Sequence, residues 1–176
     1  DRVQVSFVDI SRAYFNASTD PENLTYVQLP AEDPDSGRDV CGLLLKHMYG
    51  TQRAAEGWQS EYSSTLVDKL GFQQGIACPC MFVQAERDIV ITVHGDDFTA
   101  VGPKRQLDWY ESMLEKSYEL TKGGRLGPGA SDAKEASCLN RIVRWCDAGL
   151  EYEADPRQAE KLIEELQFDD GVNSCV

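Results

Sequence analysis

Alternating apolar and polar positions recur along the chain and predict short strands. Each such run is rich in β-branched and aromatic residues and is bounded by turn-forming residues. The predicted strands are residues 3–8, 26–29, 81–84, 89–93, 98–101, 139–145 and 149–153. The first of these places Asp9 at its end, and the fourth and fifth flank Gly95-Asp96-Asp97.

Helical spacing of apolar residues predicts three helices between these strands. Trp58, Tyr62, Leu66 and Leu70 recur every four residues and predict a helix over residues 54–70, which Gly71 closes. Pro103 suits the first position of a second helix, and its apolar face is Leu107, Tyr110 and Leu114.

The last predicted helix opens at Asp155-Pro156 with Gln158 in a capping-box position. Its predicted buried face is Ala159, Leu162, Ile163 and Leu166. Residues 123–136 hold four glycines and Pro128, which predicts a flexible loop. Together these elements predict an α+β fold, in which an antiparallel sheet has helices packed on one face.

Composition and charge narrow the class of protein. The 176 residues are 41% hydrophobic and 27% charged, which is typical of one globular domain. No apolar run approaches the roughly 20 residues of a membrane-spanning helix, so we expect no membrane partner. The net charge of -13 argues against a generic nucleic-acid-binding surface. The chain starts directly in a predicted strand without an initiator Met, from which we expect a fragment of a longer polypeptide.

The cysteines allow two interpretations. Six cysteines and two glycosylation sequons, at Asn16 and Asn23, would suit a secreted disulfide protein. Their irregular spacing favours free thiols in a reducing compartment instead, and therefore an intracellular location, in the cytoplasm or the nucleus.

The pair Asp96-Asp97 lies between two apolar strands and also has two interpretations. Gly-Asp-Asp is common in hairpin turns. However, if the strand that ends at Asp9 lies in the same sheet, three carboxylates come together, and such a cluster needs divalent cations. Hard oxygen ligands suit Mg2+, and two such ions would support phosphoryl transfer.

Several motifs in order resemble the reverse transcriptase of copia-type retrotransposons. They are Asp9-Ile-Ser-Arg-Ala-Tyr14, Lys46-His-Met-Tyr-Gly-Thr-Gln-Arg-Ala-Ala-Glu-Gly-Trp58 and Val93-His-Gly-Asp-Asp97. The resemblance continues through Leu70-Gly-Phe and Leu139-Asn-Arg-Ile-Val to about residue 168. It implies a polymerase palm in residues 1–154, without fingers, and a helix in residues 155–176 that leads toward the thumb or connection and carries an acidic tail.

The resemblance also implies roles for individual residues. Asp9, Asp96 and Asp97 would be catalytic and would hold two Mg2+ ions, with Mn2+ as a substitute. Tyr14 would lie under the sugar of the incoming nucleotide, although a core aromatic is the alternative for this residue. Gln52 and Arg53 would contact template or nucleotide, and His94 and Gly95 would lie beside the primer end.

The implied partners are an RNA or DNA template-primer, deoxynucleoside triphosphates and the rest of a polyprotein with integrase and RNase H regions. The implied activity is RNA-directed DNA synthesis, although we expect the chain by itself to be inactive. Three positions depart from the family pattern: His94 replaces a tyrosine, Arg53 a glutamine and Ala55 a proline. A catalytically inactive remnant that serves as a folding or interaction module is therefore the alternative.

Overall fold

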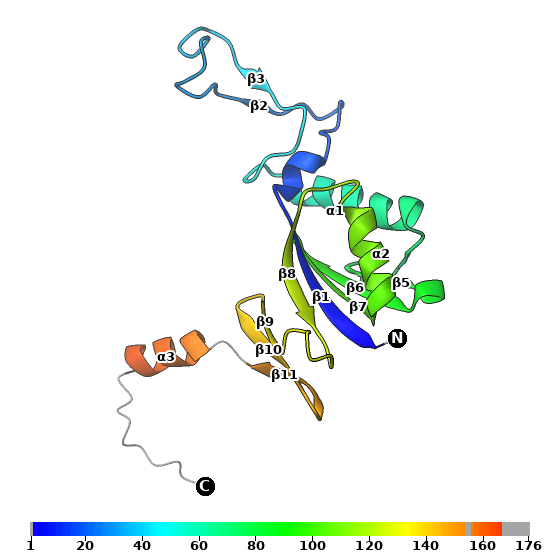
Figure 1. Cartoon of the computed structure of the whole chain (residues 1–176). Helices are drawn as coiled ribbons and strands as arrows, with labels where there is room; N and C mark the ends of the chain where they lie inside the picture. The colour runs from blue at the N-terminus through cyan, green and yellow to red at the C-terminus, as the bar shows by residue number, and fades with distance from the viewer. Residues whose placement is uncertain (1, 154–155, 167–176) are drawn as a thin grey trace.

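A six-stranded antiparallel sheet forms the centre of the protein in the computed structural model, which describes residues 2–153 and 156–166. The strand order is β4-β5-β6-β7-β1-β8 (Figure 1). The bounds are β1 Val3–Ile10, β4 Gln73–Gln74, β5 Met81–Gln84, β6 Ile89–His94, β7 Asp97–Pro103 and β8 Leu120–Leu126. The predicted α+β class is confirmed.

Two helices cover one face of this sheet (Figure 1). They are α1 (Ala54–Ser64), which continues as a π-helical turn over Thr65–Lys69, and α2 (Lys104–Leu114). The predicted stripe Trp58, Tyr62, Leu66 and Leu70 is buried in the main core. Pro103 ends β7 instead of beginning the helix, so that prediction is wrong by one residue.

Alternation along β1 divides its side chains between the two faces of the sheet. Val8 and Ile10 join the core under the helices, whereas Val5 and Phe7 pack on the opposite face. Asp9 shares the face of Val5 and Phe7 because side chains alternate along a strand. We call this face, which α1 and α2 do not cover, the open face.

A second sheet covers part of the open face. It consists of β9 (Glu135–Cys138), β10 (Arg141–Cys146) and β11 (Gly149–Glu153) in the order β11-β10-β9. Val143 packs against Val5, Phe7 and Leu126 in a small second core. The predicted hairpin of residues 139–145 and 149–153 is confirmed.

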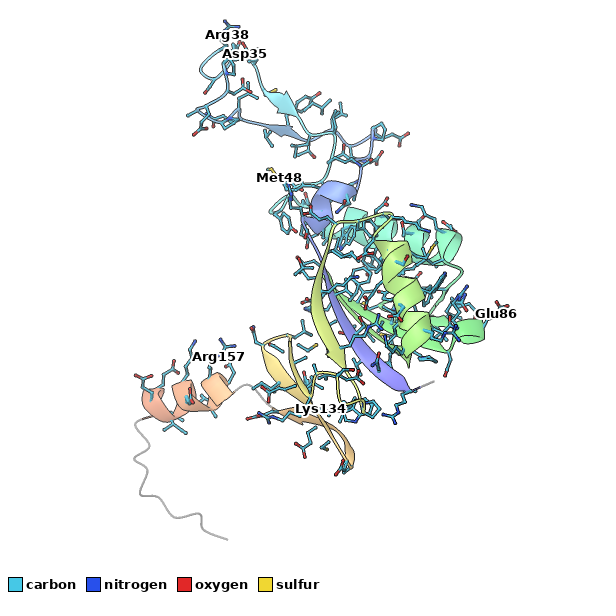
Figure 2. All side chains as sticks on the ribbon, in the orientation of Figure 1. Asp35, Arg38, Met48, Glu86, Lys134 and Arg157 are labelled. Carbon is cyan, nitrogen blue, oxygen red and sulfur yellow. The ribbon has the colours of Figure 1, made fainter. Side chains whose placement is uncertain are left out.

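The segment between β1 and α1 forms an arm that extends away from the main sheet (Figure 1). Ala13–Asn16 is a 3-10 turn at its base, and β2 (Tyr26–Val27) pairs with β3 (Gly42–Leu43) along its length. Asp35 and Arg38 form an ion pair near the far end of the arm (Figure 2). The short strand at Tyr26 is confirmed, and its partner β3 was not predicted.

The predicted flexible loop over residues 123–136 is wrong at both ends. β8 extends to Leu126, and β9 begins at Glu135. Gly123 lies so close to Phe7 that an added Cβ would be 3.2 Å from the Phe7 Cβ, and Gly124 has φ +97°. The β1–β8 register shifts between Phe7 and Val8, so these glycines belong to a β-bulge.

The last helix, α3 (Pro156–Glu165), exists as predicted, but its predicted apolar face is not buried. Leu162, Ile163 and Leu166 are 56%, 47% and 59% exposed. Asp155 lies outside the described residues, so the capping box and the domain boundary at residues 154–155 stay predictions. Within the described part of the chain, no helix has the length and apolar character needed to cross a membrane.

A buried ionic network ties α2 to the sheet. The carboxylate of Glu111 accepts hydrogen bonds from Ser6 Oγ at 2.6 Å and Arg125 Nε at 3.0 Å, and its side chain is only 10% exposed. Lys122 completes the group at 3.4 Å from Glu111. The cysteines among the described residues, Cys41, Cys78, Cys80, Cys138 and Cys146, are all free, in agreement with the free-thiol interpretation.

Candidate active site

The β6–β7 hairpin presents Asp96 on a tight two-residue turn and Asp97 at the start of β7. His94 pairs with Asp97 at the end of the ladder, so Gly95 and Asp96 alone form the loop. Gly95 has φ +65°, and Asp96 is not among the residues with positive φ. A positive φ at only the first loop position is typical of a type II′ turn, in which glycine is favoured there. Gly95 therefore permits the positive φ that either primed turn needs at this position.

Strand β1 brings Asp9 beside this turn. Asp9 lies directly opposite Asp97 in the antiparallel register, and the Ile10 N–H donates to the Asp96 carbonyl at 2.9 Å. Directly opposed residues in such a ladder have Cα atoms about 4.5–5.5 Å apart. The three predicted carboxylate residues thus meet at one end of adjacent central strands.

The carboxylates interact electrostatically. Partial burial raises the pKa of Asp9, and the charges of Asp96 and Asp97 raise it further. Burial and then Asp96 raise the pKa of Asp97, while His94 acts in the opposite direction. The negative charges therefore oppose one another, and a bound cation would relieve this repulsion.

The carboxylates offer the hard oxygen donors that Mg2+ and Mn2+ prefer. As the side chains stand, no group of three or more His, Cys, Asp or Glu residues in the described part of the chain is arranged to hold a metal ion. The residues therefore fit a divalent ion by chemistry, charge and backbone position. Their carboxyl groups have to rotate toward a common point to bind it.

An aromatic cluster lies next to the carboxylates. The ring centroids of Tyr14 and Tyr49 are 4.3 Å apart with an interplanar angle of 77°, and Phe15 lies 5.9 Å from Tyr49. Burial raises the pKa of the Tyr49 phenol, and the Asp96 charge raises it further. Tyr14 thus contacts Tyr49, whose phenol senses the Asp96 charge, and its predicted place beside the carboxylates stays a prediction. Tyr49 is a site neighbour that the sequence identified only as part of a motif.

Gln52 and Arg53 lie in a different environment. Arg53 precedes α1 and pairs with Asp20 at 4.0 Å, and both side chains are exposed. Gln52 and Arg53 line a cavity of about 400 Å³ whose lining does not include the three carboxylate residues. Their predicted contact with template or nucleotide stays a prediction. His94 is exposed next to the turn.

Trp58 is the functional neighbour that the sequence reasoning assigned only to the core. Its indole Nε1–H donates to the Gly95 carbonyl at 2.8 Å, while its ring is 1% exposed. A buried tryptophan N–H usually needs an acceptor, which is the sequence-level indication that such a bond exists. The identity of that acceptor depends on tertiary contacts.

Comparison with known proteins agrees with this geometry. The model of a family described as "Reverse transcriptase (RNA-dependent DNA polymerase)" matches residues 1–127. A search of curated proteins gave no match. The family match covers the whole six-stranded sheet, α1, α2 and every residue of the candidate site, and it ends short of the residue 168 that the motif resemblance reaches.

Proposed function

The chain belongs to the reverse transcriptase family of Ty1/copia-type retrotransposons, and from this premise we propose that it is the catalytic palm of an RNA-directed DNA polymerase. The observation that carries the proposal is the pairing of Asp9 with Asp97 beside the turn that bears Asp96. Three mutually repelling carboxylates at one sheet end disfavour the metal-free fold, and a bound cation would relieve that repulsion.

In this function Asp9, Asp96 and Asp97 would hold two Mg2+ ions. Bound there, the ions would supply Lewis-acid activation of the primer 3′-hydroxyl and would stabilise the charge on the departing pyrophosphate. The proposed role of the Tyr14 ring is to lie under the sugar of the incoming nucleotide, where a flat, rigid group would exclude a 2′-hydroxyl and so select deoxynucleoside triphosphates. The contact with Tyr49 limits the rotation of that ring.

The substrates are a nucleic-acid template-primer and deoxynucleoside triphosphates. The chain has an acidic balance of -13, so the proposal assigns most of the positive surface that holds the nucleic acid to other parts of the polyprotein. Gln52 and Arg53, at the start of α1, are the polar groups of this chain proposed to reach the template or nucleotide.

The test is direct measurement of Mn2+ binding by electron paramagnetic resonance. We expect the chain to bind Mn2+ and Asp96→Asn to bind it at least tenfold more weakly, because one ligand loses its charge and the remaining ligand set is weaker. Asp108→Asn, on α2 with its carboxylate paired to Lys104 and Arg125, is the control and should leave the affinity unchanged. Equal and negligible binding by the chain and Asp96→Asn would exclude the metal site.

A catalytically inactive remnant is the second candidate, favoured by the three departures from the family pattern at His94, Arg53 and Ala55. Primer extension by the polyprotein separates the two functions. Incorporation that Asp96→Asn abolishes supports the polymerase. A remnant that binds metal but gives no incorporation would instead act through its fold or its surface.

A further inference from the structure

The peptide between Gly95 and Asp96 has two possible orientations, and the turn type decides between them. Types I′ and II′ differ mainly by a flip of this central peptide, which moves its carbonyl from one side of the hairpin to the other. The hairpin closes on only two residues, so the ladder between His94 and Asp97 is compatible with both orientations.

A hydrogen bond from α1 selects one orientation. Trp58 Nε1–H donates to the Gly95 carbonyl at 2.8 Å from the helix-covered side of the sheet. The donor is held in place, because the Trp58 ring packs edge-on against Tyr62 at 5.5 Å and Tyr118 at 5.3 Å between ring centroids. The second carbonyl of the loop, that of Asp96, accepts from the Ile10 N–H at 2.9 Å. Both carbonyls of the loop are therefore bonded to neighbouring elements.

We propose that Trp58 is a positioning residue of the metal site, whose indole N–H fixes the Gly95–Asp96 peptide and with it the Asp96 carboxylate. This inference rests on the proposed function. The flip changes the backbone angle on the N-terminal side of Asp96, so it redirects the whole residue. Without the bond, the loop populates two arrangements, of which one presents the carboxylate to the ions.

The same bond has a second consequence for the open face. The C=O and N–H of a trans peptide point in opposite directions. With the Gly95 carbonyl directed at Trp58, the Asp96 N–H faces away from the helices, and no described residue accepts a hydrogen bond from it. Trp58 thereby presents a backbone donor beside the carboxylates, where it suits an anionic phosphate oxygen of the substrate.

The first experiment compares two tryptophan-to-phenylalanine variants in the Mn2+ binding assay. Trp58→Phe keeps an aromatic ring but removes the donor, and we expect about tenfold weaker Mn2+ binding, as for other residues that orient metal ligands. Trp109→Phe is the matched control, since Trp109 lies on α2 with its ring under Arg87 at 3.6 Å. It should leave the affinity unchanged. A folded Trp58→Phe with wild-type affinity would refute the inference.

A second variant separates the N–H from the shape of the ring and remains informative if Trp58→Phe does not fold. In a Trp109→Phe/Trp145→Phe background, Trp58 is replaced by benzothienylalanine, which has the same shape with sulfur in place of N–H. We expect the same loss of about tenfold in Mn2+ affinity, and faster exchange of the Ile10 amide hydrogen in the metal-free chain because the loop it bonds becomes mobile. Wild-type affinity in this variant would refute the role of the N–H.

The outcomes also separate this inference from the proposed function. If the wild-type chain shows no Mn2+ binding that depends on Asp96, the metal site fails and the inference fails with it. If the wild-type chain binds Mn2+ in a way that depends on Asp96, and the Trp58 variants bind it with the same affinity, the inference is wrong and the proposed function stands.

Discussion

Gly57 and His47 are in close contact, so a substitution at either residue should change the effect that a substitution at the other has on the free energy of unfolding. His47 is 8% exposed, and its backbone N–H donates to the Ala17 carbonyl at 3.0 Å, which ties the segment leading to Tyr49 to the residue that follows the 3-10 turn Ala13–Asn16. A Cβ built on Gly57 would overlap the His47 imidazole ring. Gly57 lies inside α1, one residue before Trp58, so the missing Cβ allows the site segment to pack on the helix that supports the catalytic turn.

The two single substitutions should therefore be strongly coupled. Replacing a helix-interior glycine by alanine normally stabilises by about 1 kcal/mol, whereas overpacking a filled site costs about 1–3 kcal/mol. Gly57→Ala alone should thus lower the free energy of unfolding by up to about 2 kcal/mol. In a His47→Ala background the overlap is absent, and Gly57→Ala should raise the free energy of unfolding by about 1 kcal/mol.

Urea denaturation followed by circular dichroism gives the free energies for this double-mutant cycle. The expected coupling energy is about 1–3 kcal/mol, with a reversal of sign between the two backgrounds. Stabilisation by Gly57→Ala in both backgrounds would show that the two residues are not in contact. Equal destabilisation in both would show that the glycine is needed for a reason unrelated to His47.

Two further predictions concern charged groups. Partial burial and then the charges of Asp96 and Asp97 raise the pKa of Asp9 above its ordinary value of 3.8, so Asp9 holds its proton more tightly in the metal-free fold than in the unfolded chain. Its contribution to stability should therefore be lost as pH rises from 3.8 through the raised pKa. Asp9→Asn should remove this contribution to the change of melting temperature with pH, and an unchanged pH dependence would contradict the raised pKa. Arg125→Ala should lower the free energy of unfolding by about 3 kcal/mol, because Glu111 is left buried with weaker compensation. Arg125→Lys keeps the charge, and a larger loss in Arg125→Lys than in Arg125→Ala, measured by urea denaturation, would contradict this reasoning.

The parts of the fold that follow from local pattern were predictable from the sequence. The alternation in residues 3–8 and 89–93 fixes which side chains of β1 and β6 face the helices, because a one-residue slip would expose the whole apolar set. The four-residue spacing from Trp58 to Leu70 likewise fixes the buried side of α1. The proximity of Asp9 and Asp96 also follows, provided that the strand ending at Asp9 and the strand preceding Asp96 both lie in the centre of one sheet.

The remaining features depend on contacts that local pattern does not encode. A run of glycines is typical of a loop and of a bulge alike, and only the proximity of Phe7 to Gly123 decides between them. The apolar face of α3 has the periodicity of a buried helix, but among the described residues no partner surface covers it. The acceptor of the Trp58 N–H is 37 residues away in sequence, so its identity required the tertiary structure.

The positions at which the chain departs from its family bear on the choice between polymerase and remnant. His94, Arg53 and Ala55 are all exposed, whereas the groups that hold the turn, Trp58 and the β1 backbone, are buried and intact. His94 also lies beside Asp97, where it acts against the rise in the pKa of that carboxyl group that burial and Asp96 cause. The departures therefore change the surface offered to nucleic acid and leave in place the frame that positions the carboxylates. A loss of activity in this chain would be expected to arise at the contact with template and primer before it arises at the metal site.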